Sequence, residues 1–343
     1  MSNLRLLLLL LIIPLVFSPL VIFLTKSIDQ SIGMFWDTIT FILVFVTPFS
    51  AYFASANNKI YMNSKSIDLK FNFLKEAFLF SAFMGTTLGF AMMWSDTGSG
   101  EGGQLWMMLG FNMAIALIGD TYGIIYYFSA TLLQNILGNK SNLQDKVTSK
   151  YNSNKPLTFI FLLIPLIIYG LLLIFINTNL GIDINYLFSI YGNIIFSFLF
   201  IFFVIGFLLV GSNFKIVVKS YLNLPLDTNE LTATIRDLKK LSRSMSIVTG
   251  LTTIFCLVVS GHLFASEHLA INHAFTLISF IFSISILCIL YIRTFIFRLN
   301  LELVELNHIL IDSDKYFIFK YSLPNYIVIQ IVSGFGFLIM IFK

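Results

Sequence analysis

The chain has 343 residues, of which 57% are hydrophobic and only 11% are charged. Soluble globular domains carry about 25% charged residues, so this composition excludes an ordinary soluble protein. Long apolar segments recur along the whole sequence, which predicts an all-α, polytopic transmembrane fold. The formal net charge of +4 does not indicate nucleic-acid binding, because the basic residues are confined to particular loops between the apolar segments.

We expect about nine transmembrane helices separated by polar loops. The first apolar segment is too long for a signal peptide, and no small-residue cleavage site follows it. The fourth segment exceeds the roughly 20 residues that a bilayer requires, so we expect its end to extend into the cytoplasm. The expected spans are residues 4–25, 33–56, 74–95, 105–137, 156–177, 184–212, 245–266, 270–298 and 322–342.

The basic residues predict the orientation of these spans. Of the 21 lysines and arginines, all except Lys26 and Lys343 fall on one side of the nine-span arrangement. The positive-inside rule therefore places the N-terminus in the cytoplasm and the C-terminus in the periplasm of a bacterial inner membrane. The longest loop on the cytoplasmic side, residues 213–244, is too short for a catalytic domain, and we expect it to contain a helix over Glu230–Ser244 that is capped by Asp227.

The order of hairpins and basic loops suggests a division of the chain. The first four spans and the next four have the same layout, which either reflects a degenerate internal repeat or arises by chance between hydrophobic sequences. We expect a four-helix membrane unit at 1–140, a cytoplasmic linker at 141–155, a second four-helix unit at 156–300, and an amphipathic segment with a C-terminal span at 301–343.

A hairpin over residues 81–128 carries stripes of small and hydroxyl residues at helical spacing. Small residues let helices approach closely in lipid, where packing replaces the hydrophobic effect. We therefore expect close packing of the two helices of this hairpin. The residues expected at the contact are Gly85, Gly89, Ala116, Gly119 and Gly123.

Asp120 lies on the same stripe, inside a predicted span. A carboxylate within the membrane is costly and often marks an ion or proton path. The alternative is a structural carboxyl group that is hydrogen-bonded to a hydroxyl such as that of Thr86 or Tyr126. Thr86 and Thr87 have an alternative of their own, because threonines in membrane helices commonly bond their own backbone one turn back.

Two motifs of this hairpin resemble those of a known family. Residues 85–89 (Gly-Thr-Thr-Leu-Gly) and 116–123 (Ala-Leu-Ile-Gly-Asp-Thr-Tyr-Gly) are similar to the third and fourth helices of the MotA/TolQ/ExbB family, the ring-forming subunits of ion-driven membrane motors. The resemblance covers roughly residues 1–140. Asp120 occupies the position of the family's fourth-helix threonine, and Thr121 is shifted by one. The chain also has five additional predicted spans and almost none of MotA's large cytoplasmic segment.

The resemblance implies a stator-like subunit that couples proton or sodium flow to force on a partner. It implies a homo-oligomer, with five copies surrounding a single-span partner of the MotB/ExbD/TolR type. The predicted ninth span has the direction of such a partner helix but no aspartate, so we do not expect it to be a fused partner. The residues expected in the ion path are Asp120, Thr86, Thr87 and Thr121.

Other functions receive less support from the sequence. A transporter or a non-conducting scaffold built from two similar halves is the main alternative, although a transporter usually places polar residues in both halves. No nucleophile–base cluster indicates an enzyme, and no motif indicates a cofactor. His262, His268 and His273 lack the spacing of a metal site, so we expect no bound metal.

Overall fold

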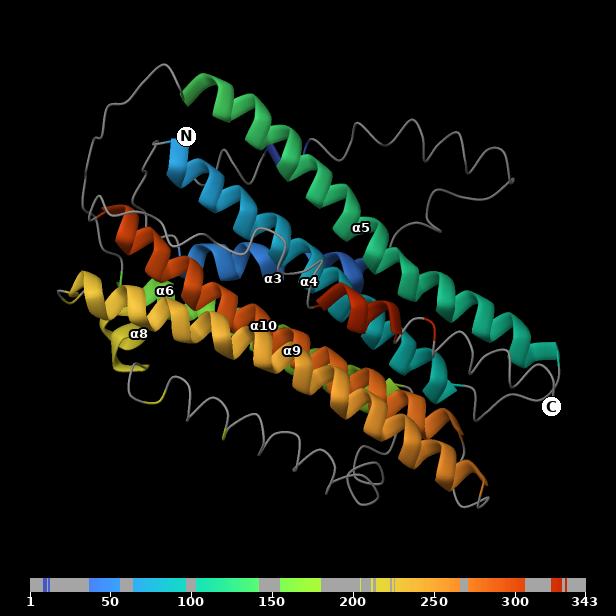
Figure 1. Cartoon of the computed structure of the whole chain (residues 1–343). Coiled ribbons are helices and arrows are strands. Elements are labelled where there is room, and N and C mark those ends of the chain that lie inside the picture. Colours follow the sequence, from blue (N-terminus) through green and yellow to red (C-terminus); the bar gives the residue numbers. More distant parts are fainter. Residues whose placement is uncertain are drawn as a thin grey trace.

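A computed structural model describes residues 9–10, 12, 37–55, 64–96, 103–141, 155–179, 204, 211, 214–222, 224, 226–265, 271–305, 322–328 and 331 (Figure 1). These residues are almost all helical and include no strand, which confirms the predicted all-α class. The helices are α3 (Thr38–Ser55), α4 (Ser64–Asp96), α5 (Gly103–Ser141), α6 (Lys155–Asn179), α8 (Phe214–Tyr221), α9 (Thr228–Ala265) and α10 (Ile271–Glu305).

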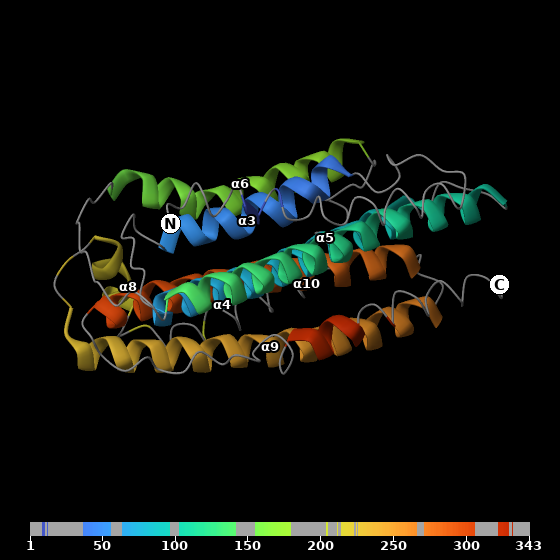
Figure 2. The same ribbon diagram turned by 90° about the horizontal axis from the view of Figure 1, so that it is seen from above.

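The long helices lie side by side in three layers. Figure 2 shows α3 and α6 on one side, α4, α5 and α10 in the middle, and α9 on the other side together with residues 322–328, which we call the C-terminal segment. The most extensive contacts of α4 are with α5 and α10. One apolar core runs through all of these helices, so the helices of the two predicted four-helix units pack against each other.

The helices extend beyond several of the predicted spans. The expected span at 74–95 is the second part of α4, which begins at Ser64, and the expected span at 270–298 continues in α10 to Glu305. Most of the predicted spans at 4–25, 184–212 and 322–342 lie outside the described residues.

The expected cytoplasmic helix and the seventh span form a single helix, α9, of 38 residues. Asp227 caps it, because its side-chain carboxylate accepts a hydrogen bond from the backbone N–H of Asn229 at 3.2 Å and its own carbonyl accepts one from Leu231. The helix begins at Thr228, slightly before the expected start.

Two of the described helices are long and apolar enough to cross a membrane. They are α3 and the part of α10 over Ile278–Val304, with mean hydropathies of 1.6 and 2.2. Both are largely enclosed by the other helices, with 67% and 78% of the residues buried in the most apolar 18-residue stretch of each.

Arg298 holds one end of the bundle together. Its guanidinium donates to the backbone carbonyls of Ser55 at 3.0 Å and Ser220 at 2.8 Å, which lie at the C-terminal ends of α3 and α8. Helix C-termini carry partial negative charge and unpaired carbonyls, so a buried cation there is well placed. Glu302 pairs with the same guanidinium at 2.9 Å, which balances the charge of a side chain that is only 2% exposed.

Candidate functional site

The small residues of α4 and α5 bring these two helices into close contact. A Cβ atom added at Gly123 would overlap that of Ala82, and one added at Gly119 would lie 3.0 Å from Oγ1 of Thr86. Gly119 also faces Thr40 of α3, so three helices meet at this level. The close approach expected from the sequence is thus present at Gly119 and Gly123.

Asp120 lies at this meeting point and is partly buried. Thr86, which is 0% exposed, donates its hydroxyl to Oδ1 of Asp120 at 3.0 Å. This is one of the two hydroxyl partners that the sequence suggested. The other, Tyr126, stacks on Phe78 and packs near Phe45, with ring centroids 5.0 and 5.3 Å away.

Asp120 accepts a hydrogen bond from a second hydroxyl, which lies in the C-terminal segment. The phenol oxygen of Tyr326 lies 2.6 Å from Oδ1 and 2.5 Å from Oδ2, and donates its proton to the carboxylate. The ring of Tyr326 stacks on Phe83, with centroids 3.9 Å apart. We call Thr86, Asp120 and Tyr326 the carboxylate cluster; it joins α4, α5 and the C-terminal segment.

The C-terminal segment is also fixed to α9. Asn325 donates its side-chain amide to the carbonyl of Ser246 at 2.6 Å. Gly250 leaves the space for this contact, because a Cβ there would lie 2.8 Å from Oδ1 of Asn325. The sequence analysis did not single out Asn325 or Tyr326. Their polar side chains at the start of a predicted span were the signal that could have indicated them.

The hydroxyls of the other two predicted ion-path residues bond to the backbone of their own helices. Thr87 donates to the carbonyls of Phe83 and Met84 in its own helix, and Thr121, which is exposed, donates to that of Leu117. These are the contacts that threonines in helices commonly make with the carbonyls of the preceding turn.

Two further predicted packing glycines lie on α4. Gly85 faces Leu43 and Thr40 of α3, and Gly89 is buried. The side chain of Ala116 lies outside the described set.

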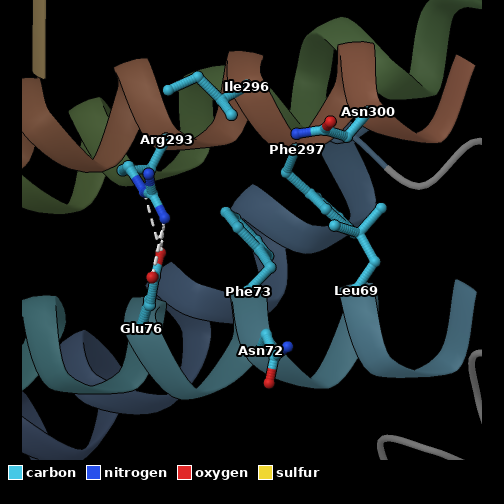
Figure 3. Close-up of a pocket in the computed structure, with 8 residues that line it drawn as sticks. All are labelled: Leu69, Asn72, Phe73, Glu76, Arg293, Ile296, Phe297 and Asn300. Carbon is cyan, nitrogen blue, oxygen red and sulfur yellow. Dashed lines mark hydrogen bonds and ion pairs between the residues drawn. The ribbon is translucent and has the colours of Figure 1, made fainter. Parts of the chain in front are cut away.

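A second polar site lies between α4 and α10 (Figure 3). Its cavity has a volume of about 20 Å³, which is room for a single water molecule. Arg293 and Glu76 form a bidentate ion pair in the wall of this cavity, with Nε–Oε2 and Nη2–Oε1 distances of 2.9 and 2.8 Å. The cavity is lined by Leu69, Asn72, Phe73, Glu76, Arg293, Ile296, Phe297 and Asn300.

Within the described part of the chain, no three His, Cys, Asp or Glu side chains lie close enough together to hold a metal ion. The side chains of His262, His268 and His273 are outside that part. The arrangement at Asp120 suits a different task, which is to hold a carboxylate inside an apolar bundle through hydroxyl donors.

Comparison of the chain with family models, with curated proteins and with solved structures gives no match. The MotA/TolQ/ExbB resemblance and the functions it implies therefore rest on the sequence motifs.

Proposed function

We propose that the chain is a multi-pass protein of a bacterial inner membrane, with its N-terminus in the cytoplasm and its C-terminus in the periplasm. Support comes from the outward faces of α5, α6 and α9, which present large apolar side chains where a soluble protein presents charged ones. Lipid would cover them. Examples are Ile124, Phe128, Leu132 and Ile136 of α5, Ile167, Leu171 and Ile174 of α6, and Ile247, Leu251 and Val258 of α9, each at least half exposed.

Within that membrane, we propose that the chain is a stator-like subunit that conducts protons or sodium ions and couples their flow to force on a partner protein. The observation that carries this proposal is the carboxylate cluster. Asp120 lies in an apolar bundle, and an ionisable side chain in that position commonly belongs to an ion pathway. A cation that passes along α4 and α5 would meet Asp120 and the hydroxyl of Thr86. The oligomer of five copies and the single-span partner follow from the family resemblance alone.

Asp120→Asn tests the proposal directly. The purified full chain is reconstituted into liposomes, and proton and sodium fluxes are followed under an imposed membrane potential. We expect Asp120→Asn to abolish the flux, because the amide neither binds a proton nor carries the charge that attracts a cation. Its elution on size exclusion should match that of the wild type. Full flux in Asp120→Asn would contradict the role of Asp120.

Thr86 and Thr87 provide a matched pair in the same experiment. Both are completely buried neighbours on α4, but only Thr86 donates to Asp120. We expect Thr86→Val to reduce the flux several-fold and Thr87→Val to leave it close to that of the wild type. Equal effects of the two substitutions would mean that the hydroxyl contact with Asp120 does not matter for conduction.

A non-conducting scaffold is the second candidate, and one observation favours it. The ion pair of Glu76 and Arg293 joins the two predicted four-helix units through their central helices, which makes a rigid connection. Native mass spectrometry of the detergent-solubilised complex separates the two functions. Five copies with two copies of a small membrane protein would support the stator-like subunit. A monomer or dimer without a partner would favour the scaffold or a transporter.

A further inference from the structure

Tyr326 covers the carboxylate of Asp120. The phenol oxygen is within 2.6 Å of both carboxylate oxygens, and the Tyr326 side chain is only 3% exposed. Hydrogen bonds to an ionised carboxylate are among the strongest in proteins. A cation or a water molecule that approaches from this direction must therefore displace the phenol before it reaches either oxygen.

The position of this phenol is fixed by the whole C-terminal segment. The Tyr326 ring stacks on Phe83 of α4 and lies near Phe282 of α10, at centroid distances of 3.9 and 6.4 Å. The neighbouring Asn325 is bonded to Ser246 of α9. The hydroxyl therefore leaves Asp120 only when the tyrosine ring turns out of its stack or when the segment moves.

The opposite face of the segment leaves room for such a movement. Ile327 and Val328 are 44% and 42% exposed, so no other described helix encloses that face. An outward shift of the segment toward that face would break the bond between Asn325 and Ser246 and separate Tyr326 from Asp120.

We propose that the C-terminal segment is a gate built into the chain, in which Tyr326 controls the access of monovalent cations to Asp120. In the closed arrangement, which is the one described here, the Tyr326 hydroxyl is hydrogen-bonded to both carboxylate oxygens of Asp120. In the open arrangement Asp120 keeps its bond to Thr86 and is exposed to the ion. The role of the gate in conduction rests on the proposed function. Whether Tyr326 shields Asp120 can be tested without measuring ion flux.

The covering is tested by chemical modification of Asp120 in the purified full chain. A hydrophobic carbodiimide, which attacks accessible carboxyl groups in membranes, is the probe, and mass spectrometry of the peptide that contains Asp120 gives the rate. We expect Tyr326→Phe to raise the rate several-fold, because the hydrogen bond is lost, and Tyr326→Ala to raise it further. Rates equal to that of the wild type in both variants would overturn the proposal.

Tyr169→Phe is the matched control. Tyr169 is another buried tyrosine, and its hydroxyl is bonded to Ser283 at 2.6 Å, so its substitution also removes one buried hydrogen bond. We expect the rate at Asp120 to remain that of the wild type in this variant. An equal increase in Tyr169→Phe and Tyr326→Phe would show general loosening of the bundle, and would overturn the gate. Should Tyr326→Ala fail to fold, Tyr326→Phe decides.

Flux measurements connect the gate to the ion path. We expect Tyr326→Phe to conduct several-fold faster than the wild type, and Tyr326→Phe combined with Asp120→Asn to conduct no more than Asp120→Asn alone. Loss of flux in a folded Tyr326→Phe would overturn the gate, because Tyr326 would then carry the ion. Faster modification of Asp120 without flux in any variant would support the covering and contradict the proposed conduction.

Discussion

Lys70 is a single residue whose charge state should affect the stability of the protein. It lies near the beginning of α4, before the predicted span at 74–95, and burial lowers its pKa to about 8. In the unfolded chain a lysine has a pKa of about 10.4. Between about pH 8 and 10 the unfolded state therefore binds more protons at Lys70 than the folded state does, and the free energy of unfolding rises with pH.

We expect Lys70→Met to remove this pH dependence and to raise the melting temperature at pH 7 by a few degrees, since no ammonium group then has to be buried. Thermal unfolding in detergent, followed by tryptophan fluorescence between pH 7 and 10, is the measurement. Lys240→Met is the control, because the Lys240 side chain is 57% exposed. The expectation fails if both variants change the pH profile of the wild type equally.

The residues of the carboxylate cluster differ in how far the sequence could predict them. Thr86 and Asp120 lie 34 residues apart on a hairpin with a short turn, so helical spacing already placed both on the facing stripes. Tyr326 lies 206 residues from Asp120. The contact between such distant segments depends on how the helices pack in three dimensions, and the periodicity of one helix contains no information about it.

The same limit applies to whole elements. Hydropathy correctly indicated the long helices in the described parts of the chain, but it located the apolar part of each helix and not its ends, and the short helix α8 was not predicted. In α9 the amphipathic residues 228–244 and the apolar part that follows form one helix, because no glycine or proline occurs from 228 to 249 to end it. Asp227 could be predicted as the cap because the rule for helix starts is local.

The contact between α4 and α5 depends on the absence of a side chain at Gly123. Since a Cβ there would overlap that of Ala82, we expect Gly123→Ala to push the two helices apart and to destabilise the protein by about 1–3 kcal/mol. The shift should also weaken the bond between Thr86 and Asp120, and so reduce the flux. Unfolding in detergent with increasing denaturant measures the first effect, and the liposome assay measures the second.

Gly170→Ala in α6 is the control for this helix contact. Apart from its own helix backbone, no atom lies within 4 Å of the position that its Cβ would take, so the methyl group should be tolerated. Alanine is the better helix former by about 1 kcal/mol, and Gly170→Ala should be neutral or slightly stabilising. If Gly123→Ala proves as stable as Gly170→Ala, the inference that α4 and α5 leave no room for a methyl group at Gly123 is wrong.

At the scale of the whole molecule, charged side chains are buried within the apolar bundle while large apolar side chains are exposed on its outer faces. Arg293 and Arg298 are 4% and 2% exposed, whereas Leu171 and Leu251 are 61% and 62% exposed. In water this distribution would be unfavourable, because buried charges must be paired and large apolar patches promote association. In lipid it is expected, since every polar group must find a partner within the protein.

The ion pair of Glu76 and Arg293 joins the two predicted four-helix units, so its loss should affect the molecule as a whole. Removing one partner leaves an unpaired buried charge and should lower the free energy of unfolding by about 3–5 kcal/mol. Replacing both partners with apolar residues often leaves that free energy unchanged. We therefore expect Glu76→Leu and Arg293→Met to lower the melting temperature when each is made alone. The double substitution should bring the melting temperature most of the way back to that of the wild type. Thermal unfolding in detergent is the measurement.

The exposed pair of Lys219 and Glu230, 3.9 Å apart, is the control, because such pairs contribute at most about 1 kcal/mol. Since α4 and α10 share one apolar core, all of these variants should unfold in a single transition. Two separate transitions in Arg293→Met would mean that the units at 1–140 and 156–300 fold independently. In that case the ion pair would join two separate domains, and the C-terminal segment would reach Asp120 across their boundary.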